Sequence, residues 1–251
     1  MKVLVLGATG NLGSRLVPAL LNHGHSVVAY VRSSSKLESL LSEPIYRQIA
    51  VVQGDAKDSA AIKKAILDSG ADAVINTAGM AALPPWGKSD LPEIFRAVVQ
   101  GVQEAGEERN KPLRTWFLGG LGVMTFPGTE LMFSDYIPIY LEHRQDLALL
   151  KSLPPNSIDW SLLCPSTMTP ESSDLSALTS KGKLIANATT PPLWQDYWVK
   201  NIPLIGGYLS CGMNAPRYET TLEQNAEFIA GDLETLESPF SEKTVGVIDP
   251  K

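Results

Sequence analysis

The chain has 251 residues, a formal net charge of −6 and two cysteines, Cys164 and Cys211. An acidic chain is a poor match for nucleic acid, and two cysteines supply neither a disulfide framework nor a metal cluster, so we expect no metal. No apolar run reaches the ~18 residues of a membrane span and no signal pattern opens the chain, so we expect a soluble, cytoplasmic protein with no membrane partner.

Short β-rich apolar runs alternate with helical patterns as far as Pro165. The predicted strands are 2–6, 26–31, 49–53, 71–76, 113–118 and 157–163, and the predicted helices are 11–23, 36–41, 59–68, 91–107 and 139–152. Ser35 and Asp58 precede two of these helices and are suitable N-cap residues. This order predicts an α/β fold with a doubly wound, mainly parallel Rossmann-type sheet and helices on both faces.

The alternation stops after Cys164. Residues 165–218 carry several prolines and aromatic residues, and regular patterns return only with a helix at 221–233 and a strand at 244–248. Segments of this length without regular structure are usually functional loops. We therefore expect a single domain over 1–251, in which 165–220 forms a small loop-rich cap on the substrate side.

Three glycines, Gly7, Gly10 and Gly13, separate the first predicted strand from the first predicted helix in the stretch GATGNLG. In such a turn the first glycine permits the bend, the second lets the backbone approach a pyrophosphate, and the third lets the helix pack on the sheet. The helix N-terminus then directs free amides at the phosphates. The strand–turn–helix context favours a dinucleotide site over a bare turn.

The second predicted strand ends in Arg32, which is followed by three serines and Lys36. An acid at this position binds the 2′-hydroxyl of NAD, whereas an arginine accommodates the 2′-phosphate of NADP. A guanidinium group offers parallel donors to a phosphate. We therefore expect NADP(H) as the cofactor; the alternative is a solvated surface arginine.

Four motifs carry a family resemblance: GATGNLG, VRSSSKL, GDAKD at 54–58 and INTAG at 75–79. They resemble the atypical short-chain dehydrogenase/reductases, above all the NmrA-like and flavin (biliverdin-IXβ) reductase-like NAD(P)-binding group. The resemblance covers roughly residues 1–165. It implies that Thr9, Gly10, Asn11 and Leu12 line the pyrophosphate, and that Asp55 and Ala56 flank the adenine. It also implies that Thr77, Ala78 and Gly79 pass behind the ribose near the nicotinamide, and that Pro165 lies beside the nicotinamide.

The chain departs from the wider superfamily at the catalytic positions. Typical members place a serine after the fifth strand and Tyr-x-x-x-Lys on the next helix, but here Gly119 and Gly120 follow that strand, and Arg144 stands four residues after Tyr140. An arginine does not titrate. The flavin-reductase-like pattern places His143 at the nicotinamide, where an imidazole can relay a proton. The spacing predicts that Tyr140, His143 and Arg144 share one catalytic helix face; the alternative is that they are structural.

Aromatic residues and methionines gather in two long loops that should lie beyond the carboxyl ends of the strands. Such a lining suits a flat, apolar substrate, and ordinary loop packing is the alternative. Trp116 and Trp160 lie within predicted strands and are expected in the core. The predicted substrate-binding residues are Met80, Trp86, Met124, Phe126, Tyr136, Trp194 and Trp198, with Phe133 and Tyr197 beside them.

These features predict an NADPH-dependent reductase of a small, largely apolar or aromatic carbonyl, quinone or flavin-like substrate, working as a monomer or homodimer. Hydride transfer needs no protein nucleophile, so the missing serine and lysine do not exclude it. Two alternatives stay open. One is an NmrA-type sensor that binds NADP(H) without turnover; the other is an isomerase or cyclase that retains the cofactor on the same fold.

Overall fold

A largely parallel sheet organises the molecule, for which a computed structural model describes residues 1–79, 89–173, 175, 182–235 and 237–250. Its eight strands follow the order β3-β2-β1-β4-β5-β6-β10-β8, and only β8 runs antiparallel to its neighbour. The strands are β1 (Lys2–Leu6), β2 (Ser26–Val31), β3 (Ala50–Gln53), β4 (Ala73–Asn76), β5 (Arg114–Leu118), β6 (Asp159–Leu163), β8 (Ile185–Ala188) and β10 (Lys243–Ile248). The predicted fold class is confirmed.

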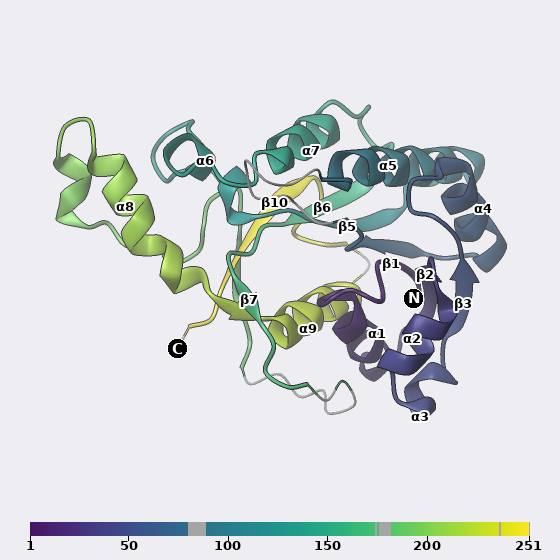
Figure 1. Cartoon of the computed structure of the whole chain (residues 1–251). Helices are drawn as coiled ribbons and strands as arrows, with labels where there is room; N and C mark the ends of the chain where they lie inside the picture. The colour runs from purple at the N-terminus through teal and green to yellow at the C-terminus, as the bar shows by residue number, and fades with distance from the viewer. Residues whose placement is uncertain (80–88, 174, 176–181, 236, 251) are drawn as a thin grey trace.

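Helices cover both faces of this sheet, with α4, α5 and α7 on one side and α1 and α9 on the other (Figure 1). Within the described ranges, every helix falls short of the length or apolar character that crossing a bilayer requires. The helices are α1 (Gly13–Asn22), α2 (Ser34–Leu40), α3 (Glu43–Tyr46), α4 (Ser59–Ser69), α5 (Leu91–Glu108), α6 (Phe133–Tyr136), α7 (Glu142–Lys151), α8 (Gly206–Asn214) and α9 (Leu222–Asp232).

The region after Cys164 contains more regular structure than its sequence indicates. Besides β8 and α8 it holds a small parallel pair, β7 (Met168–Thr169) and β9 (Thr220–Thr221), which was not predicted. Among the described residues, short 3₁₀ turns are formed by η1 (Leu121–Val123), η2 (Trp198–Asn201) and η3 (Ala215–Tyr218). Helix α8 escaped prediction because it contains glycines and most of its apolar side chains are exposed, so it has no clear buried stripe.

The N-caps of helices α4 and α2 test the capping predictions made from the sequence. Asp58 caps α4 as predicted, because its carboxylate accepts the N–H of Ala61 at 2.9 Å. For α2 the prediction of Ser35 was wrong: the hydroxyl of Ser33 accepts the N–H of Lys36 at 3.2 Å. Three consecutive serines are chemically equivalent as caps, so which of them caps α2 depends on the residue at which β2 ends.

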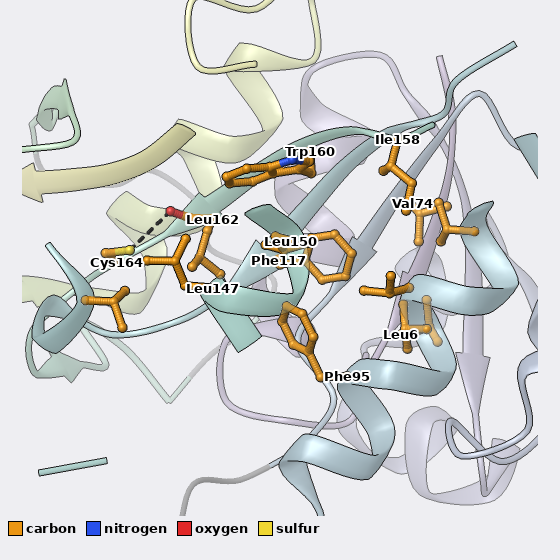
Figure 2. Packing of buried hydrophobic residues seen from close by; sticks show 14 of the residues in the cluster. Leu6, Val74, Phe95, Phe117, Leu147, Leu150, Ile158, Trp160, Leu162 and Cys164 are labelled. Carbon is orange, nitrogen blue, oxygen red and sulfur yellow. Dashed lines mark hydrogen bonds between the residues drawn. The ribbon is translucent and has the colours of Figure 1, made fainter. Parts of the chain in front are cut away.

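The core has one half on each face of the sheet, and β1 contributes to both. Leu4 and Leu6 pack with α4, α5 and α7, whereas Val3 and Val5 pack with α1 and α9. Figure 2 shows the first half, where the rings of Phe95 and Phe117 lie 4.8 Å apart and Leu147 and Leu150 of α7 lie against the sheet. Trp116 and Trp160 are buried, which confirms their assignment to the core.

A buried ion pair joins the last residue of α9 to the start of β5. Asp232 accepts hydrogen bonds from the Arg114 guanidinium at 2.7 Å and from the Trp116 indole N–H at 2.9 Å. Arg114 also lies over the Trp116 ring, 5.0 Å from its centroid. Since both charged side chains are almost fully buried, each depends on the other for compensation of its charge.

We predict that Asp232→Ala lowers the free energy of unfolding by about 3–5 kcal/mol, because it leaves a buried guanidinium group without its main partner. Urea denaturation measures the change. The control is Asp68→Ala, which breaks the exposed ion pair to Lys64 and should cost less than about 1 kcal/mol. Equal, small losses in the two variants would show that the Arg114 pair does not stabilise the fold.

Candidate functional site

The site lies where the strand order reverses. Strands β2 and β4 both pair with β1, on its opposite sides, so the loops after β1 and β4 leave the sheet next to each other. The N–H and the hydroxyl of Thr77 each donate to the carbonyl of Leu6 at 3.0 Å. Crevices of this kind are the usual ligand sites of open α/β sheets.

The three glycines of the first loop have different surroundings. Gly7 has φ +85°, and a Cβ there would lie 2.6 Å from the nitrogen of Ala78; a Cβ on Gly13 would lie 2.1 Å from the carbonyl oxygen of Gly7. At Gly10 a Cβ would approach only that same oxygen, at 3.2 Å, and otherwise meets open space. The exposed backbone at Gly10 therefore fits the close approach of a diphosphate, while Gly7 and Gly13 are required by packing.

The neighbours of Gly10 contribute unequally to this loop. Thr9 is half-buried and Asn11 is exposed, so both are accessible from the crevice. Leu12 is buried in the core beside α1, so only its backbone is available to a ligand. The loop therefore offers backbone groups and small polar side chains, which is the donor set that a pyrophosphate takes from a helix N-terminus.

A buried arginine that sequence reasoning missed fixes this loop to the C-terminal part of the chain. Arg15 donates to the carbonyl of Asn11 at 2.9 Å, to the Glu223 carboxylate at 2.6 Å and to the carbonyl of Ser172 at 2.8 Å. Burial acts to raise the pKa of Glu223, but hydrogen bonds from the Glu171 N–H and from Arg15 outweigh it and hold that pKa below its usual value. Glu223 is therefore a charged partner at neutral pH.

The residues predicted to contact the adenosine end lie after β2 and β3. Arg32 and Lys36 are exposed, and their side chains have no hydrogen-bond or ion-pair partner within the described ranges. Asp55 uses its carboxylate within a turn, accepting the N–H of Lys57 at 3.0 Å, and its carbonyl accepts the Tyr30 hydroxyl at 3.1 Å. Ala56 packs partly against the core. The two cations are thus accessible to an anion at the carboxyl end of β2.

A cavity of about 560 Å³ opens beside the glycine loop. Its polar groups come mainly from Asn11, Thr77 and the loop after β6, and its apolar wall comes from α6, the following loop and the segment after β5. His143 is the one histidine among the described residues that line the cavity. The lining residues are Asn11, Thr77–Gly79, Leu91, Leu118–Gly122, Phe133, Ile137, Ile139, Tyr140, His143, Pro165–Met168 and Ala215.

The three predicted catalytic residues do not share one helix face. Helix α7 begins at Glu142, not at 139, because Tyr140 has φ +52°, a backbone conformation outside the helical region. Tyr140 and His143 both line the cavity, but Arg144 does not; its guanidinium donates to Asp135 at 2.8 Å. The predicted helix start and the shared face were therefore wrong, while two of the three side chains do meet at the cavity.

His143 lies next to the glycine pair that replaces the expected serine. A Cβ on Gly120 would lie 3.2 Å from Cδ2 and 3.5 Å from Nε2 of the imidazole. The ring therefore reaches the end of β5 and lies over the backbone there. The imidazole therefore lines the same cavity as the loops that follow β1 and β4.

Most of the aromatic residues predicted to bind substrate pack against one another instead. The Phe126 ring lies 5.1 Å from both Tyr136 and Trp194, and Phe133 lies 5.2 Å from Trp194. Within this cluster only Phe133 lines the cavity, and Met124 is fully buried. Trp198 is 75% exposed and Tyr197 donates to Gln195, both outside the cavity. Met80 and Trp86 lie outside the described residues.

The segment Leu118–Gly122 was missed as a cavity wall, although its glycines were noticed as a departure from the superfamily. Gly119 donates to the carbonyl of Leu163 and Leu121 to that of Pro165, each at 2.8 Å. These bonds hold the ends of β5 and β6 together, so both form the same wall. A glycine pair directly after a strand was the available signal for a close approach of another group.

Comparison with known proteins identifies the family. Residues 7–191 match the family model described as NAD(P)H-binding. The chain belongs to this NAD(P)H-binding family. The family and the NAD(P)-binding fold indicated by the glycine loop are thereby confirmed. Whether the nucleotide is NAD or NADP is not distinguished by this match.

Individual relatives are distant. The protein YwnB of Bacillus subtilis is 27% identical over 200 residues, covering 75% of this chain and 83% of that protein. Sterol demethylase protein B of Methylococcus capsulatus is 30% identical over 127 residues, covering 49% of this chain, and the chain spans only 36% of its length. A short-chain dehydrogenase/reductase of Veillonella parvula, solved in complex with NADP, matches with a TM-score of 0.64 at 14% identity, covering 99% of this chain and 94% of that one.

We predict that Gly10→Val leaves the fold intact and weakens dinucleotide binding by at least about 100-fold, a loss comparable to two hydrogen bonds from charged groups. The added side chain meets little protein but occupies the space in front of the loop. Calorimetry with NADPH measures binding, and thermal unfolding checks the fold. The control is Gly212→Val in α8, where a Cβ also meets open space. Normal NADPH binding by Gly10→Val would show that the loop is a bare turn.

Proposed function

We propose that the protein is an NADPH-dependent reductase of a small, uncharged, largely apolar or aromatic carbonyl, quinone or flavin-like compound. The observation that carries the proposal is the cavity of about 560 Å³, in which the glycine-loop crevice, an apolar wall and one imidazole meet. A mostly apolar cavity with a few convergent polar groups is the usual form of a small-molecule site. The proposal rests on this combination and on membership of the NAD(P)H-binding family.

The residues of the crevice fit a dinucleotide. The backbone of Gly10 and Asn11 would face the pyrophosphate, and Thr77, Ala78, Gly79 and Pro165 would border the ribose and nicotinamide. Arg32 and Lys36 are exposed and are not engaged by another side chain in the described ranges, so both would be available to the 2′-phosphate. This supports NADP(H) over NAD(H). When bound, the reduced cofactor supplies the hydride.

The character of the cavity supports an uncharged substrate. None of its described lining residues is a lysine or an arginine. A carboxylate or phosphate there would meet no lysine or arginine side chain, and these supply the paired hydrogen bonds that such groups usually take. Phe133, Ile137 and Ile139 instead offer flat apolar surface. Residues 165–220 act as the substrate-side cap in this proposal, since Pro165–Met168 and Ala215 reach the cavity from that region.

The chain offers two proton donors at the cavity. The His143 imidazole lies beside Gly120 with its side chain 12% exposed, and Tyr140, which also lines the cavity, is 36% exposed. We assign His143 as the general acid, because it is more enclosed and its ring lies over the end of β5. Tyr140 is the second candidate, and its positive φ is of a kind that clusters at functional sites.

We predict that Arg32→Ala weakens NADPH binding by about 1.5–3 kcal/mol, the range for hydrogen bonds to charged groups, and leaves NADH binding nearly unchanged. Isothermal titration calorimetry with both nucleotides measures the difference. Arg47→Ala is the control, since Arg47 is also exposed but pairs with Glu43 on α3. An equal loss for both nucleotides would remove Arg32 from the 2′-phosphate site.

We predict that His143→Gln lowers kcat by ~10²–10⁴-fold, the contribution of a general acid, while NADPH affinity is retained. Oxidation of NADPH is followed by absorbance with a panel of quinones, flavins and aldehydes. Tyr140→Phe, which keeps the ring, is compared in the same assay.

Three outcomes would revise this assignment. A loss confined to Tyr140→Phe would transfer the role to Tyr140. Parental turnover in both variants would mean that water protonates the substrate. No turnover by the parent with any compound, despite tight NADPH binding, would favour the sensor function.

A further inference from the structure

Helix α7 turns one acidic side chain toward the protein interior. Its inward face carries the half-buried His143 and the buried Asp146, Leu147 and Leu150, spaced as residues on one side of a helix are. Figure 2 shows the two leucines of this face among the core residues next to β5 and β6. The side chain of Asp146 is only 3% exposed, so an acid takes a position where this face otherwise carries apolar residues.

Among the described residues, the ionisable group in ion-pair range of Asp146 is His143. Its Oδ2 lies 3.4 Å from Nδ1 of the imidazole, and within the described chain neither atom has a hydrogen-bond partner. The nearby cation, Arg144, is engaged by Asp135 on α6. A buried carboxylate is costly unless a hydrogen bond or opposite charge compensates it, and the imidazole is the group in position to do so.

We propose that Asp146 is a positioning residue that holds His143 with its proton on Nδ1, so that Nε2 is the nitrogen presented to the cavity. The opposite edge of the ring supports this: Nε2 and Cδ2 lie next to Gly120, which lines the cavity together with His143. The partner of one ring nitrogen decides which form the other takes. The contact of 3.4 Å is long for a hydrogen bond, and such contacts commonly tighten when a ligand binds.

A role for Asp146 at the helix N-terminus does not explain its position. Asp146 is the fifth residue of α7, and the acid in the first turn is Glu142. Favourable interactions with the helix dipole are confined to the first turn. The carboxylate is also too buried for solvent to compensate its charge. The pairing with His143 accounts for both its depth and its direction.

The arrangement has a chemical consequence that rests on the proposed function. When the substrate oxygen takes a proton from Nε2, the imidazolium becomes neutral and keeps its remaining proton on Nδ1, toward Asp146. Solvent then returns a proton to Nε2. Throughout these steps the Nδ1–H bond keeps facing the Asp146 carboxyl group. Without that group, the neutral ring is free to place its proton on Nε2 and its lone pair on Nδ1, facing away from the cavity.

The test uses nitrogen-15 NMR of the imidazole rings in the full chain without nucleotide, at a pH where the ring is neutral. The chain has three histidines, so a His143→Gln spectrum assigns the signals of His143. The wild-type ring should carry its proton on Nδ1. In Asp146→Asn the amide can donate to Nδ1, and the proton should move to Nε2. Asp135→Asn, which alters the neighbouring ion pair to Arg144, is the control and should leave the His143 signals unchanged.

A wild-type ring protonated on Nε2 would overturn the proposal, as would identical ring signals in the wild type and Asp146→Asn. Should Asp146→Asn fail to fold, the wild-type spectrum and that of Asp146→Glu, which keeps the carboxylate, still decide. Turnover is measured separately: Asp146→Asn should lower kcat by ~10²–10⁴-fold with little change in KM. The expected ring signals without turnover by any variant would contradict the reductase function and leave the positioning role of Asp146 standing.

Discussion

The site depends on a close contact between two backbones. A side-chain carbon at Gly7 would lie 2.6 Å from the nitrogen of Ala78 and 2.8 Å from the hydroxyl of Thr77, so any other residue would force the loops after β1 and β4 apart. Because they are in contact, Asn11 and Thr77 border the same cavity. A single missing side chain therefore allows the segment expected to bind the pyrophosphate and the segment expected to border the nicotinamide to form one continuous surface.

Buried ion pairs connect the glycine loop and β5 to helix α9 near the end of the chain. Arg15 and Glu223 are 208 residues apart in sequence, yet their contact attaches the start of α1, and through Asn11 the glycine loop, to α9. Asp232 attaches the other end of α9 to β5. Such pairs contribute less to net stability than to fixing one arrangement, because their desolvation offsets much of their attraction. The C-terminal helix is therefore part of the support of the nucleotide site.

Local sequence patterns predicted the structure correctly wherever residues of a single segment determine it. The apolar runs, the glycine loop and the Asp58 cap all depend on neighbouring residues, and each lies where it was predicted. The aromatic residues predicted to bind substrate were misplaced because Phe126, Tyr136 and Trp194 pack together from three separate segments, a contact that no sequence periodicity indicates. Arg144 was misplaced for the same reason, since its partner Asp135 belongs to a different helix. The local sequence pattern likewise does not predict that Asp146 is buried.

The glycine that stands in place of the superfamily's serine after β5 has a steric reason, which the sequence alone does not show. A side chain at position 120 would press on the imidazole of His143, because even its first carbon would lie 3.2 Å from the ring. A serine there and a histidine reaching over it from α7 therefore compete for one volume at the end of β5. The glycine makes room for the ring, and the leucines of α7 fix the depth to which the ring reaches. The missing serine and the inward-facing histidine are thus two parts of a single packing arrangement.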